Sequence, residues 1–155
     1  MRKALLVLAF CGFAASLWAA DPSVGTWKYN VSKAKLAPSA QAAVKEQTVI
    51  IQEAGDQWEI AETGTRIDGS SISQKYTRSK QGGVVNGQPP LPEGQSYVDT
   101  VIEPGNWYLT VLQNGKQVSV THCVVSKDGK TLQLTTKSTD AKGKSYQEVE
   151  VYDKQ

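Results

Sequence analysis

The sequence predicts an all-β protein, folded as a closed up-and-down antiparallel β-barrel of eight to ten strands. Three observations predict it: turn-forming clusters recur at short intervals, the segments between them alternate apolar and polar side chains, and no long helical period occurs. An open meander would leave an unpaired edge on its first and last strands, and closure removes both edges. We therefore expect the opening strand, 25–31, to pair with the final strand, 147–153.

The first 20 residues have the layout of a secretory signal peptide, with Arg2 and Lys3 ahead of a short apolar run and small residues. Cleavage is expected after Ala20, or alternatively after Ser16, and a lipid-modified Cys11 is a further alternative. Residues 21–155 then form one domain, exported to the periplasm or secreted.

The mature domain has no net charge. Of 17 basic and 15 acidic residues, the leader removes two basic ones, which leaves 15 of each. Neither nucleic acid nor insertion into a membrane is therefore implied. Cys123 is the single mature cysteine, so no internal disulfide can form, and we expect it to be an inert small residue.

Turn chemistry divides the domain. The expected reversals are Ala54-Gly55-Asp56, Asp68-Gly69, Gly82-Gly83, Pro104-Gly105, Asn114-Gly115, Asp128-Gly129 and Lys142-Gly143. The strands expected between them are 27–31, 46–52, 57–64, 71–78, a weak 83–85, 96–103, 106–113, 117–125, 131–138 and 145–152. Two stretches do not fit tight hairpins, 32–45 and the proline-rich 86–95, and we expect them to be lids or binding loops, the first with one short helical turn at 39–46.

Each strand can offer the core one row of side chains. The apolar rows suggest that Trp58 and Ile60 point inward, as do Leu132 and Leu134. In 117–125 the apolar row is Val118, Val120 and Val124, which places His122 inward too. In the last strand, valines facing the core would leave Glu148 and Glu150 in solvent.

The stretch Gly25-Thr26-Trp27 opens the first strand. A glycine before a strand tryptophan lets another backbone approach, and the indole can close the narrow end of a barrel. This Gly-x-Trp resembles the calycin superfamily, which includes lipocalins and fatty-acid-binding proteins. Together with the Tyr152-Asp153-Lys154 ending, the mature chain also resembles a group of secreted bacterial lipocalin-like proteins. The resemblance implies a barrel that binds a small molecule, with Gly25, Trp27 and Tyr152 as structural residues.

The chain departs from that pattern in two ways. The late arginine that packs over the tryptophan in lipocalins has no counterpart, because the mature arginines are Arg66 and Arg78. The Arg-x-Tyr with which fatty-acid-binding proteins hold a carboxylate is replaced by Glu150-Val151-Tyr152, and an acidic residue repels a carboxylate. A fatty-acid head group is therefore not an expected ligand.

The chemistry favours a binding protein over an enzyme, without cofactor or metal, because no nucleophile elbow, phosphate loop or metal-ligand spacing occurs. The expected partner is a small apolar or amphipathic molecule. The alternative is a protein-interaction or inhibitor module with a filled barrel, which binds through its loops. The residues expected to line the ligand cavity are Trp58, Ile60, Tyr76, Arg78, Tyr97, Trp107, Leu109, His122 and Leu134.

Two of these residues have a second interpretation. Arg78 shares a row with Ile72 and Tyr76, so it can point inward to meet Glu62 or an anionic ligand, or else form a surface ion pair at the strand end. His122 can serve as a hydrogen-bonding group inside the cavity, or be satisfied by a neighbouring side chain.

Overall fold

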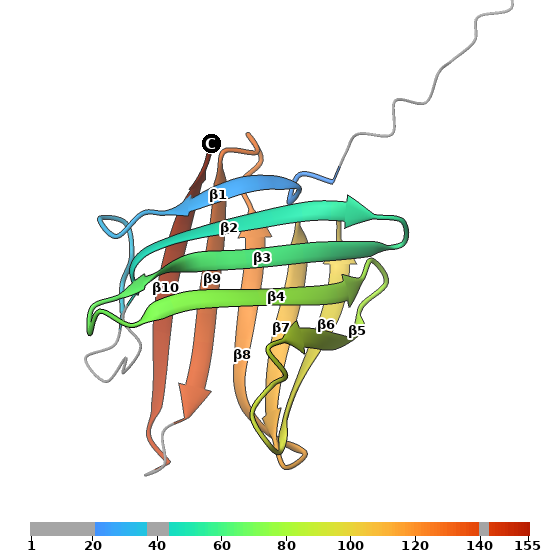
Figure 1. The fold of residues 1–155 in the computed structure, drawn as a ribbon, viewed down its shortest axis with the longest axis vertical. Helices are drawn as coiled ribbons and strands as arrows, with labels where there is room; N and C mark the ends of the chain where they lie inside the picture. The colour runs from blue at the N-terminus through green and yellow to red at the C-terminus, as the bar shows by residue number, and fades with distance from the viewer. Residues whose placement is uncertain (1–20, 37–43, 140–142) are drawn as a thin grey trace, which may run out of the picture.

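The computed structural model describes residues 21–36, 44–139 and 143–155, and these form ten antiparallel strands in one closed barrel (Figure 1). The strands are β1 (Gly25–Tyr29), β2 (Val44–Ala54), β3 (Gln57–Arg66), β4 (Ser71–Ser79), β5 (Gly83–Gln88), β6 (Gln95–Glu103), β7 (Asn106–Gln113), β8 (Lys116–Val125), β9 (Thr131–Thr139) and β10 (Ser145–Lys154). The predicted fold class is therefore confirmed, at the upper end of the expected strand number.

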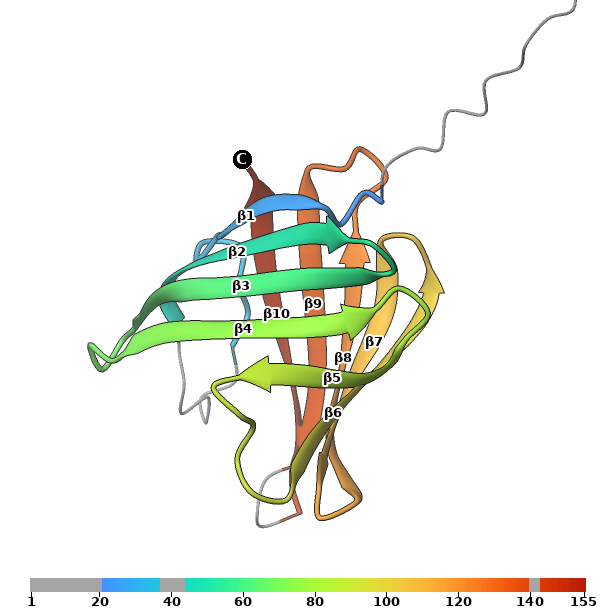
Figure 2. The ribbon, with the colours of Figure 1, turned by 45° about the vertical axis from the view of Figure 1, so that its right-hand side comes forward.

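Each strand pairs with its neighbours in the chain, and β1 pairs with β10 to close the barrel. In space, β1 to β4 form one layer that crosses the layer of β6 to β10, and the short β5 joins the two layers between β4 and β6 (Figures 1 and 2). The interior therefore lies between two crossing layers that belong to one continuous sheet.

The reversals between strands fall where six of the turn clusters predict them, and Lys142 of the seventh, Lys142-Gly143, lies outside the described residues. Asn114 and Gly115 show why, because both have positive φ, 50° and 74°, in the two-residue link between β7 and β8. Positive φ at both central positions matches the twist of a tight hairpin, and asparagine and glycine tolerate it best. The hairpins are thus encoded locally, which explains the simple strand order.

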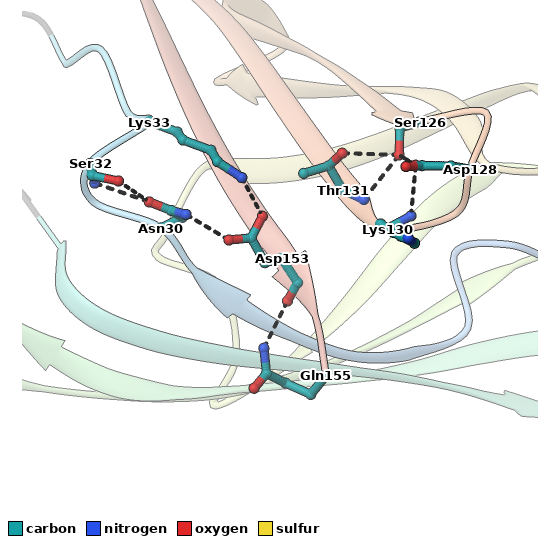
Figure 3. A network of polar contacts seen from close by, with 9 residues as sticks. All are labelled: Asn30, Ser32, Lys33, Ser126, Asp128, Lys130, Thr131, Asp153 and Gln155. Atoms are coloured by element: carbon teal, nitrogen blue, oxygen red, sulfur yellow. Dashed lines mark hydrogen bonds and ion pairs between the residues drawn. The ribbon is translucent and has the colours of Figure 1, made fainter.

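The seam that closes the barrel is fixed by backbone and side-chain contacts. Trp27 is opposite Lys154 and Tyr29 is opposite Tyr152 in the β1–β10 ladder. On the outer face, the Asp153 carboxylate accepts hydrogen bonds from Asn30 Nδ2 at 2.6 Å and from Lys33 Nζ at 2.8 Å (Figure 3). The turn that follows β1 is thereby held against the outer surface of β10.

The two expected long loops differ in outcome. The second is shorter than expected, because Asn86–Gln88 belong to β5 and Gln95 begins β6. Of the first, residues 37–43 lie outside the described residues, and 44–46 of the expected helical turn belong to β2. The expected signal peptide, 1–20, also lies outside them. No helix in the described part of the chain is long and apolar enough to span a membrane.

Candidate functional site

The interior of the barrel is tightly packed at one end. Trp27 is 0% exposed and Ile51 2%, and both belong to one buried cluster with Trp58, Trp107, Cys123 and Leu132. The Trp27 indole Nε1 donates a 2.8 Å hydrogen bond to the carbonyl of Ser23, in the segment that leads into β1. Trp27 therefore closes this end of the barrel, as the opening motif predicts.

Lys154 supplies a cation over Trp27, with its Nζ 4.9 Å from the ring centroid. The sequence has no late arginine to pack over Trp27, and in the structure Lys154 takes that position. The role expected of Gly25 also needs correction. A Cβ on Gly25 would lie 2.7 Å from Cε of Lys154, so the glycine makes room for a side chain rather than for another backbone.

Arg78 is buried at the same end of the barrel as Trp58 and Trp107 of this cluster. It makes an ion pair with Asp99, with Nη1 2.9 Å from Oδ2. Its guanidinium lies between two indoles, 4.6 Å from the Trp58 centroid and 4.2 Å from that of Trp107. Burial raises the pKa of Asp99, and the attraction of Arg78 works against that rise. Of the two expected interpretations, the inward one holds, but the partner is Asp99 rather than Glu62 and the pair does not lie on the surface.

A chain of hydrogen bonds links inward side chains of β10, β2 and β3. The Tyr152 hydroxyl donates to Gln47 Oε1 at 2.7 Å, and Gln47 Nε2 donates to Glu62 Oε2 at 3.1 Å. Gln47 and Tyr152 are both buried. Glu62 is therefore oriented by residues of β2 and β10, which reach it from other parts of the barrel wall.

Two interior glutamates have perturbed acidity. Burial, followed by repulsion from Glu150, raises the pKa of Glu62 from 4.5 to about 7. Burial, followed by repulsion from Glu148, raises the pKa of Glu150 from 4.5 to about 7. The expectation that Glu148 and Glu150 face solvent is wrong for this strand, because they share a face with buried Tyr152. Val151 lies on the other face, and its carbonyl accepts a 2.8 Å hydrogen bond from the backbone N–H of Asn30.

A pair of tyrosines lies close to Glu62. The rings of Tyr76 and Tyr97 are 6.2 Å apart, and the Tyr76 hydroxyl donates to the side chain of Gln74. Burial raises the pKa of both tyrosines, and the negative charge of Glu62 adds to the rise. Aromatic faces and a carboxylate therefore share one region of the lumen.

Most residues predicted to line the lumen share the inward face. Trp58, Arg78 and Trp107 are buried in the packed end, and the others of this set are only partly buried although they lie on the same faces of their strands: Ile60, Tyr76, Tyr97, Leu109 and Leu134. The inward residues next to the closed floor are thus partly exposed, whereas Ile72, farther along β4, is buried again at 6% exposure.

His122 is the exception, because its predicted direction is wrong. Thr121 and Cys123 are the buried residues of β8, so His122 points to the outer surface. There it hydrogen-bonds to Asn106 Oδ1 at 2.8 Å and stacks on Tyr108, with ring centroids 4.4 Å apart. It lines an outer groove of about 390 Å³, and the alternative of a histidine satisfied by its neighbours is the one observed.

Sequence reasoning did not identify four polar residues of the interior: Tyr29, Gln47, Glu62 as a wall residue, and Glu150. One sequence feature does point to Glu150, because it lies two residues from Tyr152 on the same face of a strand. Apolar periodicity does not find such residues, since it counts a polar side chain as a mark of the outer face. Among the described residues, no group of three or more His, Cys, Asp or Glu side chains is arranged to hold a metal ion.

Two solved structures resemble this one at low sequence identity. The sequence matches no protein-family model and no curated protein. The structure resembles that of Ex-FABP, a siderocalin described as functioning through dual ligand specificities, with a TM-score of 0.43 and 10% identity over 86% of this chain and 71% of that one. It also resembles lobster apocrustacyanin A1, with a TM-score of 0.47 and 16% identity over 88% of this chain and 63% of that one. The chain forms a closed up-and-down barrel with Gly25 and Trp27 at the head of its first strand.

Proposed function

We propose that this chain is an exported, non-enzymatic binding protein that holds a small apolar or amphipathic molecule inside the barrel. The observation that carries the proposal is the partial exposure of inward residues that lie next to the closed floor. Arg78 and Trp58, at the floor, are 3% and 4% exposed, whereas Ile60 and Tyr76, one step along the same strands, are only partly buried. In a barrel filled with side chains these inward residues would be buried as well.

The wall offers both parts of an amphipathic site. Ile60, Leu109 and Leu134 provide apolar surface, and Ile60 and Leu134 pack against the buried cluster. Tyr76 and Tyr97 provide aromatic surface with hydroxyl groups. Few polar groups on a mostly apolar concave surface are what small-molecule sites have in common. Arg78 forms part of the floor of the site, where its Nη1 pairs with Asp99.

Binding is tested with a neutral apolar fluorophore, N-phenyl-naphthylamine, titrated into the mature protein. The expected result is saturable fluorophore emission together with quenching of the tryptophans. Leu134→Trp, which places a larger side chain on the inner wall, should weaken binding. Val118→Trp is the matched control, because Val118 lies in the neighbouring strand and is 37% exposed on the outer surface. A fluorophore that fails to bind, or that binds both variants like the parent, would contradict the proposal.

Export is tested separately, by expressing the full chain in a bacterium and measuring the mass of the protein recovered from the periplasm and the medium. Cleavage after Ala20 or after Ser16 gives distinct masses. Recovery of the uncleaved chain in the cytoplasm would contradict this part of the proposal.

A further inference from the structure

The partly exposed part of the inward face carries two carboxyl groups. Glu62 lies opposite Val49 in the β2–β3 ladder, and Glu150 lies opposite Leu134 in the β9–β10 ladder, so both share a strand face with residues of the buried cluster. Both are partly exposed despite facing inward. A solute that enters the barrel therefore meets two carboxyl groups on its wall.

The two carboxyl groups retain acceptor capacity. Glu62 accepts one hydrogen bond, from Gln47, on Oε2. No described residue donates a hydrogen bond to Glu150 or forms an ion pair with it, and nothing in the described part of the chain donates to Oε1 of Glu62. An ionised carboxylate offers about four acceptor positions, so most of this capacity is available to a ligand.

A buried hydroxyl at the same place also lacks a partner. Tyr29 is 7% exposed, and its hydroxyl has no hydrogen-bond partner in the described structure. Its ring lies 5.4 Å from that of Tyr152, which lies two residues from Glu150 on the same strand face. Burial raises the pKa of Tyr29, and the charges of Glu150 and Glu148 raise it further. Buried hydroxyl groups are rarely left unpaired, which makes this one a position for a polar atom of a ligand.

The cations of the described interior are engaged elsewhere. Arg78 pairs with Asp99 through Nη1, and its Nε and Nη2, which have no hydrogen-bond partner in the described structure, are buried at the floor beside the indoles of Trp58 and Trp107. Lys154 Nζ donates to the carbonyl of Pro22 at 3.0 Å beside Trp27. Arg66, whose charge acts on Tyr76, hydrogen-bonds to the carbonyl of Ser71 in an exposed position. The acidic wall therefore has no counter-ion among these three side chains.

We propose that the barrel binds protonated amines that carry an apolar group: the ammonium contacts Glu62, Glu150 and the hydroxyl oxygen of Tyr29, and the apolar part lies along Ile60, Leu109 and Leu134. This inference rests on the proposed function and names its ligand class. An ammonium has three donors and no acceptor, which matches two carboxylates and a phenol oxygen. The rings of Tyr76 and Tyr97 beside Glu62 add a surface that favours cations.

The test compares three molecules of one chain length, octylammonium, octanol and octanoate, as displacers of N-phenyl-naphthylamine at pH 8. Octylammonium is expected to bind about tenfold or more tightly than octanol, because a charge-assisted hydrogen bond is worth about 1.5–3 kcal/mol. Octanoate is expected to bind more weakly than octanol, since the wall repels its charge.

Three variants assign the preference to the named groups. Glu62→Gln and Glu150→Gln should each reduce the advantage of octylammonium over octanol while octanol binding persists, and Tyr29→Phe should reduce it less. Glu59→Gln is the matched control, because Glu59 lies on β3 near Glu62 but is exposed on the outer face. Octanol binding also reports that each variant is folded.

The outcomes separate the two proposals. If the fluorophore and octanol bind but octylammonium has no advantage, or if Glu59→Gln removes the advantage as fully as the inward variants, the amine proposal is overturned and the binding function stands. If neither the fluorophore nor any octyl compound binds, the proposed function fails first. If Glu62→Gln does not fold, Glu150→Gln alone decides between these results.

Discussion

Arg78 and Asp99 form an ion pair that is almost wholly removed from solvent, with 2.9 Å between Nη1 and Oδ2 and side-chain exposures of 3% and 2%. The indoles of Trp58 and Trp107 enclose the guanidinium. Because taking a charge out of water is costly, each member of such a pair depends on the other. The pair and its two tryptophans therefore act as one unit in closing the floor of the barrel.

Arg78→Met should lower the free energy of unfolding by about 3–5 kcal/mol, because it leaves the Asp99 carboxyl group buried without its partner. A double variant, Arg78→Met with Asp99→Leu, should recover much of that loss, since it removes both charges. Equilibrium unfolding in guanidinium, followed by tryptophan fluorescence, measures both variants.

The control for this prediction is the exposed ion pair between Lys33 and Asp153, whose side chains are 52% and 38% exposed. Lys33→Met should change the free energy of unfolding by less than about 1 kcal/mol, as is usual for surface pairs. If Arg78→Met costs no more than Lys33→Met, the buried pair does not have the role assigned to it.

Stability without a ligand should fall as the pH rises from about 4.5 to about 7, because burial raises the pKa of Glu62 and of Glu150 to about 7. In that window the native state binds more protons than the unfolded state, so ionisation favours unfolding. The expected loss is on the order of 2–4 kcal/mol for the two groups together. Chemical denaturation at a series of pH values measures it.

Glu62→Gln and Glu150→Gln provide the control for the pH profile. Each variant should flatten the decline and be more stable than the parent at pH 8, because an amide does not ionise. Hydrogen bonds lower the pKa of three other carboxyl groups, so these groups change the stability only below about pH 4.5: Asp68, Asp128 and Asp153. Variants that keep the full slope would show that other groups cause it.

The sequence was sufficient for the fold because the information is local. Turn residues and alternating segments specify hairpins, and closure follows from the need to pair the edges of β1 and β10. Sequence reasoning did not assign the faces of β8 and β10 correctly. In β8 the valines at 118, 120 and 124 look like a core row, yet Thr121 and Cys123 are buried.

The reason lies in the polarity of the lumen. Hydrophobic alternation assigns the apolar row to the inside, and it fails where the inner wall itself is polar. In β10 the inner row contains Glu148 and Glu150, while Val151 on the outer face is buried at 8% exposure. The carboxyl groups of the candidate site, Glu62 and Glu150, were therefore missed, whereas its apolar and aromatic wall and Arg78 were predicted.

Gly25→Ala should destabilise the barrel by about 1–3 kcal/mol, because Gly25 has φ of 140°, which L-residues rarely adopt. The new Cβ would also lie 2.7 Å from Cε of Lys154 and displace that cation from Trp27. Gly129→Ala is a useful comparison, since Gly129 has φ of 70° in an open turn with no atom within 4 Å of the added Cβ. The midpoint of thermal unfolding should be lower for Gly25→Ala than for Gly129→Ala. The reverse order would contradict the contact with Lys154.

Cys123 should not react with a thiol reagent such as dithiobis-nitrobenzoate while the protein is native. Its side chain is buried in the tryptophan cluster at 3% exposure, and burial raises the pKa of its thiol well above the ordinary value, so almost no thiolate forms. In a denaturant the same thiol should react at the rate of a free cysteine.

At intermediate denaturant the labelling rate should follow the population of unfolded molecules, which gives the free energy of opening of the closed floor. Arg78→Met, which loosens that floor, should accelerate native-state labelling, whereas Lys33→Met should not. Rapid labelling of the native parent protein would mean that β8 presents Cys123 to solvent, and that the inward row is the one of His122 after all.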